Sequence, residues 1–248
     1  MKFSVIVFSK NEADNIKACL ESAQWAEEIV LIDDYSQDET VKLAQEFDNV
    51  KVVQHSLKDF ASQHNFGMKQ AIGDWLFFLD ADERISAELK KQIQAVIKNP
   101  QKQAAFQVNR INIFLGQRMK YGGWSPDRPT RLFKTINLRG WRGILHESSI
   151  VDGEIGYLDG QLYHFSHRGL SSMLNKTIAW SKMEAQLRLD AGHPPVTWWR
   201  VLRIGLSEFF NRLLIKQAWR DGMAGWIEVI YQSNSLMITY LRLWEIQS

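Results

Sequence analysis

Hydrophobic positions in the first hundred residues follow two alternating periods. Two continuous apolar runs, Phe3 to Phe8 and Trp75 to Leu79, are typical of parallel strands that are buried on both faces. Shorter runs predict further strands at 28–32 and 50–54, and apolar residues at helical spacing predict helices near 16–23, 36–47, 60–71 and 86–98. This alternation predicts an α/β fold with a doubly wound, mostly parallel sheet.

Local signals mark the ends of three predicted helices. The segment Ser36-Gln37-Asp38-Glu39 matches a capping box, which predicts that a helix starts there and runs to about Phe47. Gly73 is predicted to close the next helix, and Pro100 to stop the one after it.

In the second half of the chain, the composition and the hydrophobic periodicity change near residue 168. Residues 105–168 are rich in Gly, Arg and aromatics, with strand-like pieces at 105–109 and 130–133. From Gly169 onward the pattern is helical and contains six of the ten tryptophans. We therefore expect one α/β domain over 1–168 and a helical region over 169–248.

The sharpest chemical feature is a group of acids after the apolar run at 75–79. Asp80 and Asp82 are two residues apart, so in an extended segment they face the same way and can converge on one cation. Such an oxygen-rich site suits Mg²⁺ or Mn²⁺, which also bind substrate phosphates. The alternative is a solvated acidic turn before a helix.

Two further loops follow strands of the same sheet. Ser9 and Glu12 follow the first strand, and Asp33 and Asp34 follow the second. Ligands bind at the carboxyl ends of parallel strands, where these acceptors could bond a base N–H or ribose hydroxyls. The alternative is helix capping, to which two adjacent carboxylates are less suited.

The charge distribution suggests an anionic partner. Residues 1–100 hold 11 Lys and Arg against 17 Asp and Glu, whereas the remainder holds 19 against 11 within a net charge of +2. A basic second half favours nucleic acid, phosphorylated glycan or a lipid surface. The single cysteine, the early charge after the first strand and the lack of a long apolar stretch predict a cytoplasmic protein without a signal peptide or spanning helix.

Three ordered motifs carry a family resemblance: SVIVFSKNE, IVLIDDYSQDET and GDWLFFLDADE. At these spacings the chain resembles the family-2 glycosyltransferases with the GT-A fold. The resemblance implies that residues 1–168 are the nucleotide-sugar-binding catalytic domain, with a UDP-sugar donor held by the first two loops and a metal held by the aspartate pair. Asn65 is a further nucleotide-sugar candidate, although Gln63-His64-Asn65 departs from the Arg-containing family pattern, so no phosphate-binding Arg is assigned there.

The second half resembles a narrower group, the bacterial lipopolysaccharide inner-core β-1,4-glucosyltransferases that act on heptose. The matching stretches are 126–133, 143–147 and 163–168. The resemblance implies an inverting transfer of a hexose, glucose by expectation, to a lipid-linked inner-core saccharide. Another cell-envelope glycan is the alternative acceptor.

Residue roles follow from this reaction. A single displacement needs one base at the acceptor hydroxyl; the resemblance favours Glu147, with Asp127 second and a structural ion pair as the alternative for either. His164 resembles the histidine that completes metal or diphosphate binding, although a structural histidine is about as common. Arg128 and Arg131 could each bind a phosphate through bidentate hydrogen bonds from the planar guanidinium group.

The segment 198–216 mixes basic and aromatic residues at helical spacing. It predicts a helix in an anionic membrane interface, peripheral on the inner face of the cytoplasmic membrane. A helix packed on the catalytic domain or in a homodimer is the alternative. The lipid-linked acceptor favours the membrane.

Other protein classes fit less well. A sugar nucleotidyltransferase usually has a Gly-rich phosphate loop after its first strand, and FSKNEADN contains no glycine. No recognition motif for nucleic acid is present, so we expect no nucleic-acid partner. If the acids after the apolar run at 75–79 bind nothing, the remaining interpretation is a non-catalytic membrane-surface protein.

Overall fold

The computed structural model describes residues 1–99, 102–144, 147–167 and 169–248. The chain forms two compact units: residues 1–111 with 127–164, and residues 112–126 with 165–248. The second unit therefore includes a loop in addition to the helical region expected from the sequence. The assignment of catalysis to residues 1–168 stays a prediction.

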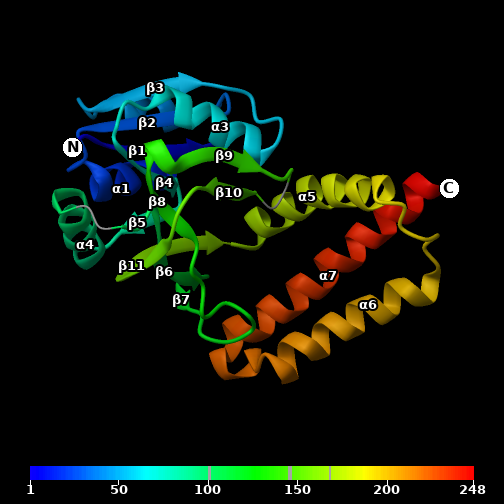
Figure 1. Ribbon diagram of the computed structural model, residues 1–248. Coiled ribbons are helices and arrows are strands. Elements are labelled where there is room, and N and C mark those ends of the chain that lie inside the picture. Colours follow the sequence, from blue (N-terminus) through cyan, green and yellow to red (C-terminus); the bar gives the residue numbers. More distant parts are fainter. Residues whose placement is uncertain (100–101, 145–146, 168) are drawn as a thin grey trace. The chain divides into compact units, whose positions relative to one another are not determined.

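Four parallel strands form the centre of the first unit, in the order β3-β2-β1-β4 (Figure 1). Their bounds are Phe3–Ser9 for β1, Glu28–Asp33 for β2, Val50–Gln54 for β3 and Trp75–Asp80 for β4. The register pairs Ser9 with Asp33 and Phe8 with Asp80. The carboxyl ends of three strands, and the polar residues that follow them, therefore meet at one edge of the sheet.

Beyond β4 the sheet continues through β8, β6, β11 and β5. The pairings β4–β8, β8–β6 and β11–β5 are antiparallel. The bounds are Glu83–Ile85 for β5, Ala105–Phe114 for β6, Gln117–Arg118 for β7, Thr130–Lys134 for β8 and Ile155–His167 for β11. A separate antiparallel pair consists of β9 (Leu138–Arg142) and β10 (Ser148–Val151), after the short helix η1 (Thr135–Asn137).

Helices cover both faces of the sheet because side chains alternate along each buried strand. Val5 and Val7 lie in a core with α1 (Ala13–Ala23), α2 (Thr40–Ala44) and α4 (Ala87–Lys98). Ile6 lies in the opposite core, against α3 (Phe60–Gln70) and β9. The predicted α/β fold with a largely parallel sheet is confirmed.

Two predicted helix ends are wrong. Ser36 does not cap a helix: its hydroxyl oxygen accepts from the Asn11 backbone N–H, its own N–H and hydroxyl donate to Asp33, and α2 begins only at Thr40. Gly73 does not close α3, which ends at Gln70; it approaches the backbone of Ser4 so closely that a Cβ would lie 2.7 Å from the Ser4 nitrogen.

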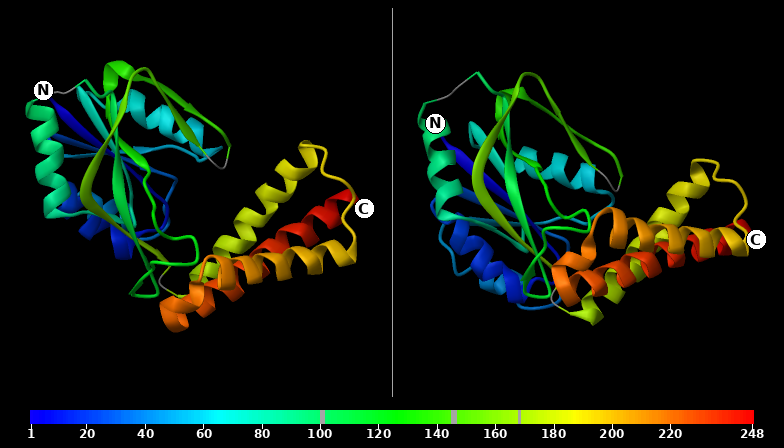
Figure 2. Two further views of the ribbon diagram at one scale, coloured as in Figure 1. Left: turned by 60° about the horizontal axis from the view of Figure 1, so that its bottom comes forward. Right: turned by 90° about the horizontal axis from the view of Figure 1, so that it is seen from below.

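The second unit is helical. Its elements are α5 (Leu170–Asp190), α6 (Trp198–Phe210), η2 (Asn211–Ile215), η3 (Ala218–Asp221) and α7 (Gly222–Gln247). The long α7 packs against both α5 and α6 (Figure 2). The buried Asp221 carboxylate accepts from the backbone of Lys120 and Tyr121 at 2.9 and 2.8 Å, which ties loop 112–126 to these helices. Among the described residues, no helix is long and apolar enough to cross a membrane.

Candidate active site

The ends of β1 and β2 form a closed hydrogen-bond network. Asp33 is fully buried and accepts from the Ser9 hydroxyl at 2.9 Å and from the Ser36 backbone at 2.8 Å. Asp34, also buried, pairs with Lys10 at 2.6 Å and accepts from the Leu57 backbone at 3.1 Å. These carboxylates shape the loops at the sheet edge through fixed contacts.

The turn between β4 and β5 carries three acids, of which Asp80 and Glu83 share one arginine. Arg131, from β8, donates through one nitrogen to Asp80 at 2.6 Å and to Glu83 at 2.7 Å. Glu83 is fully buried, whereas the Asp80 side chain is 38% exposed. Asp80 is therefore the acid through which this buried ion cluster reaches the surface.

Charge pairing controls the ionisation of the cluster. Burial alone would raise the pKa of Asp80, but attraction to Arg131 and their hydrogen bond hold that pKa well below its usual range. Burial raises the pKa of Glu83, and Arg131 only partly offsets it. The two carboxylates raise the pKa of the Arg131 guanidinium against the effect of burial. Asp80 thus stays ionised beside a permanent cation.

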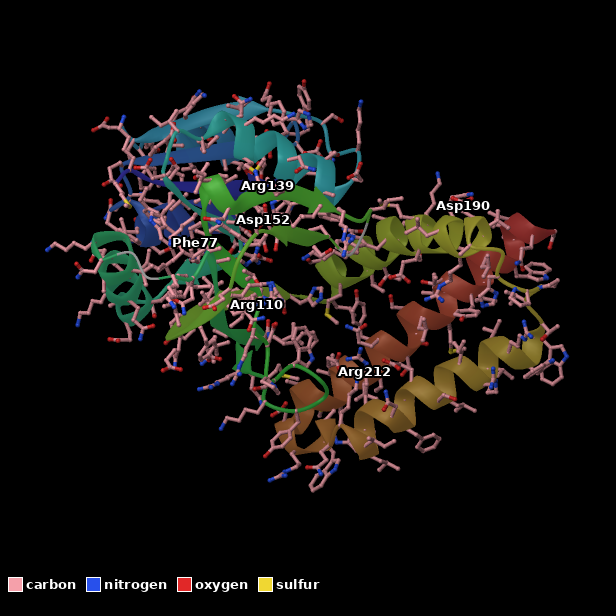
Figure 3. All side chains as sticks on the ribbon, viewed as in Figure 1. Phe77, Arg110, Arg139, Asp152, Asp190 and Arg212 are labelled. Atoms are coloured by element: carbon pink, nitrogen blue, oxygen red, sulfur yellow. The ribbon has the colours of Figure 1, made fainter. Side chains whose placement is uncertain are left out.

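A second arginine extends the cluster to Asp127. Arg110, which is labelled in Figure 3, comes from β6 and donates to Asp127 at 2.7 Å and to Glu83 at 3.2 Å. Sequence reasoning gave roles to neither Arg110 nor Glu83. The signal in the sequence was the position of Arg110 between the apolar residues Val108 and Ile111. A cation buried in a strand needs an acidic partner, and the nearby β4–β5 turn supplies three acids. Through Arg110 and Arg131, Glu83 links Asp80 to Asp127, the second candidate base.

Asp82 faces a different partner. Its carboxylate lies 3.6 Å from Nε2 of His164, which β11 places in register with Glu83. Both side chains are mostly buried. Carboxylate and imidazole are suitable donors for a divalent cation, and this pair fits such a role. Asp80 is turned to Arg131 instead, and within 1–99, 102–144, 147–167 and 169–248 no three acidic, His or Cys side chains form a ready metal site.

Other predicted residues lie in different surroundings. Asn65 exchanges two hydrogen bonds with the Trp141 backbone, at 2.8 and 3.0 Å, and so joins α3 to β9. Glu12 accepts from Asn15 at the start of α1. The exposed Arg128 lies over the Tyr157 ring at 4.6 Å.

Glu147 is half-buried and directly precedes β10. Its neighbours in the 143–147 motif, Leu145 and His146, lie outside the described residues, as does Arg168 of the 163–168 motif.

Comparison with known proteins identifies relatives along the whole chain. The family model described as glycosyl transferase family 2 matches residues 4–151. The lipopolysaccharide core biosynthesis glycosyltransferase LpsC of Rhizobium meliloti (strain 1021) is 23% identical, over 99% of this chain and 93% of its own length. The uncharacterized glycosyltransferase RP128 of Rickettsia prowazekii is 25% identical, over 92% and 82%.

Among solved structures, residues 1–349 of S. aureus TarS in complex with UDP-GlcNAc are similar. The TM-score is 0.52 at 17% identity, covering all of this chain and 91% of that one. The likeness confirms the expected GT-A fold.

Proposed function

Because the chain belongs to glycosyltransferase family 2, we propose that it transfers a hexose from a UDP-sugar to the inner core of a lipopolysaccharide or lipooligosaccharide. The similarity to LpsC, a lipopolysaccharide core biosynthesis glycosyltransferase, supports the acceptor class, and the similarity to TarS in complex with UDP-GlcNAc supports the donor class. The assignment of glucose as the transferred sugar and heptose as the acceptor residue rests on the resemblance of the second half of the chain to the inner-core glucosyltransferases. The reaction is a single displacement that inverts the anomeric carbon.

The observation that carries this proposal is the ion cluster at the carboxyl end of β4. It joins Asp80, beside the nucleotide loops, to Asp127 through Arg131, Glu83 and Arg110. Ligands of such sheets bind at this edge. A buried cluster that ends in a nucleotide-side acid and an acceptor-side acid suits a reaction that brings donor and acceptor together.

The donor is proposed to lie against the ends of β1, β2 and β4. The residues assigned to it are Ser9, Glu12, Asp33, Asp34, Asn65, Asp80, Arg128 and Arg131. Asp33 and Asn65 act by holding loops in shape, because their polar atoms already bond within the protein. Arg128 is exposed and is the arginine free to reach a phosphate, whereas Arg131 is engaged with two carboxylates.

Asp82 and His164, with Asp80 nearby, are the residues proposed to hold a divalent cation, Mg²⁺ or Mn²⁺. When bound, it would neutralise charge on the departing UDP. The acceptor hydroxyl gives its proton to Glu147 or, in the second assignment, to Asp127. The Arg110 contact orients Asp127, which favours a defined geometry for that carboxylate.

A hydrolysis assay tests the donor and metal assignments. Purified protein is incubated with UDP-glucose, UDP-galactose or UDP-GlcNAc, with Mn²⁺ or with EDTA, and UDP release is measured. We expect slow metal-dependent release with one preferred UDP-sugar. Formation of UTP and a sugar 1-phosphate when pyrophosphate is added would instead favour a nucleotidyltransferase, and full activity in EDTA would exclude the metal role.

A lipid-linked acceptor would place this reaction at the inner face of the cytoplasmic membrane. The protein is proposed to attach there as a peripheral protein through its helical unit. A homodimer through the same helices is the alternative to this attachment.

A further inference from the structure

The face of α6 that follows Trp199 is apolar and open. Trp199, Leu202, Leu206 and Phe210 are spaced three or four residues apart, so they share one side of the helix. Each of these side chains is about half exposed, from 46% to 58%. A row of large apolar side chains at that exposure marks an interaction surface.

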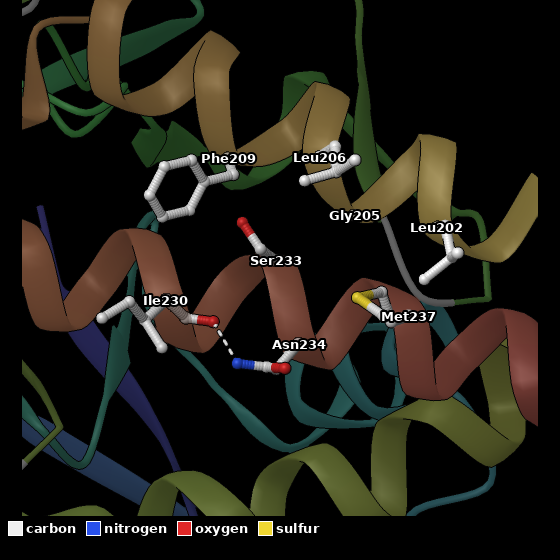
Figure 4. Close-up of a pocket in the computed structure, with 8 residues that line it drawn as sticks. All are labelled: Leu202, Gly205, Leu206, Phe209, Ile230, Ser233, Asn234 and Met237. Atoms are coloured by element: carbon white, nitrogen blue, oxygen red, sulfur yellow. Dashed lines mark hydrogen bonds between the residues drawn. The ribbon is translucent and has the colours of Figure 1, made fainter.

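A groove between α6 and α7 continues this surface inward. Its volume is about 320 Å³, and Leu202, Leu206 and Phe209 face Ile230, Ser233 and Met237 across it (Figure 4). Leu202, Leu206 and Ile230 are also among the exposed residues, so the groove opens at the surface. Among the described residues the buried Ser233 hydroxyl has no hydrogen-bond partner. The groove is thus an apolar slot with one unsatisfied hydroxyl.

Basic and aromatic residues lie at both ends of this face. At one end Arg200 and Arg203 lie over the Trp199 ring, at 5.7 and 5.5 Å. Beyond the other end are the exposed Lys216, Trp219 and Arg220. From 198 to 220 the one acidic residue is Glu208, which is bonded to Arg212. The excess positive charge of this segment is therefore not balanced within it.

The charge distribution selects the occupant. A two-fold contact with a second copy would bring the same uncompensated arginines and lysines together, and like charges facing each other are costly. Anionic headgroups are complementary to them, and tryptophan rings favour the membrane–water boundary. We propose that this face docks on an anionic bilayer, with a lipid acyl chain in the α6–α7 groove. The proposal rests on the proposed function for the lipid-linked acceptor, but its test does not use transfer activity.

Vesicle sedimentation tests the docking. The protein is mixed with phosphatidylcholine vesicles, with or without phosphatidylglycerol, at low and high salt. We expect binding to the anionic vesicles that high salt weakens. Replacing Arg203, Lys216 and Arg220 with Gln should weaken binding by roughly 100-fold, at about fivefold for each basic residue. Equal binding to neutral vesicles, or a wild type that ignores both, overturns the proposal.

Two variants separate the groove from the rest of the surface. Leu206→Glu should reduce vesicle binding at least about tenfold, because a charge would enter the apolar slot. Ile136→Glu is the matched control, since Ile136 is 82% exposed on η1 in the other unit, and its binding should not change. UDP-sugar hydrolysis should stay normal in both variants. Unchanged binding by Leu206→Glu overturns the groove assignment.

A photoreactive p-benzoylphenylalanine in place of Leu206 identifies the occupant directly. Irradiation with anionic vesicles should give a protein–lipid adduct in mass spectra, and the same residue at position 136 should not. A protein–protein adduct would show that a second copy fills the groove. That result, or no adduct at all, overturns the proposal.

Discussion

The guanidinium of Arg131 lies 2.6 Å from the carboxylate of Asp80, so the first of the two predicted metal-binding aspartates is ion-paired within the protein. The second acid, Asp82, faces His164 instead. The two aspartates that the sequence groups together therefore have different electrostatic surroundings. We therefore expect substitutions of Asp80 and of Asp82 to have different effects on stability and on metal binding.

Loss of Arg131 should destabilise the first unit strongly. Arg131→Met keeps much of the volume but leaves Glu83 and Asp80 without their shared cation, which costs about 3–5 kcal/mol for a buried pair. Arg139→Met is the control, because the Arg139–Asp152 pair is more than half exposed on both sides and should cost no more than about 1 kcal/mol. Denaturant unfolding measures both, and equal costs would contradict the assignment of Arg131 as the central buried cation.

Metal binding should depend on Asp82 and His164 more than on surface acids. Asp82→Asn or His164→Gln should raise the dissociation constant of Mn²⁺ at least about tenfold in the presence of UDP, because each removes a donor. Calorimetric titration measures this. Asp159→Asn, at an exposed carboxylate on β11, is the control. If His164→Gln behaves like the control, His164 is a structural histidine.

The base is identified by comparing two isosteric variants. The variant that removes the base, Glu147→Gln or Asp127→Asn, should lower kcat by about 10²–10⁴-fold while UDP affinity stays unchanged. Asp127→Asn also weakens the contact to Arg110, so a parallel unfolding measurement separates a chemical from a structural effect. A loss of UDP affinity together with turnover would exclude either residue as the base.

The helical unit should lose stability as pH rises toward neutrality. Burial raises the pKa of Glu228 from 4.5 to about 7, although Arg212 at 2.7 Å and Lys216 favour the charged form; Glu208 disfavours it. Because the folded-state pKa is the higher one, the folded chain holds a proton that the unfolded chain has released between about pH 4.5 and 7. The stabilisation is complete below this interval and is lost as pH rises through it.

Glu228→Gln should remove this dependence. The variant is expected to match the wild type at about pH 4 and to exceed it by up to about 3 kcal/mol at about pH 8, since the neutral side chain never has to be kept protonated or lose a proton. Unfolding measured at both pH values tests the sign. A variant that is less stable than the wild type at the higher pH would mean that the ionised pair with Arg212 is net favourable.

The parallel half of the fold could be predicted because its strands are buried on both faces and carry continuous apolar runs. Antiparallel β11 could not, since Ile155 to His167 mixes glycine, charged and apolar residues and is defined by pairing with distant β5. The Ser36 cap failed for a local reason: Asp33 accepts the Ser36 N–H that Glu39 would accept in a capping box, and the Ser36 hydroxyl oxygen accepts from the Asn11 backbone.

The candidate site was predictable in composition more than in geometry. The sequence brings Ser9, Asp33 and Asp80 to one sheet edge through the strand order, and the structure places them there. It does not reveal that Arg131 and Arg110 come from β8 and β6 to bind Glu83, because those contacts join residues 48 and 27 positions apart. The C-terminal helices were predictable from periodicity, but their groove depends on packing between α6 and α7.

Hexose transfer to a lipopolysaccharide inner core is tested most directly by the mass of the acceptor after reaction. A truncated lipopolysaccharide inner core is incubated with the preferred UDP-sugar and Mn²⁺, and the product is analysed by mass spectrometry and anomeric NMR. We expect the addition of one hexose with inverted anomeric configuration, matched by UDP release and lost in Asp82→Asn. An acceptor that gains no hexose while UDP is released at the same rate with and without acceptor, or a product with retained configuration, would contradict the proposed transfer.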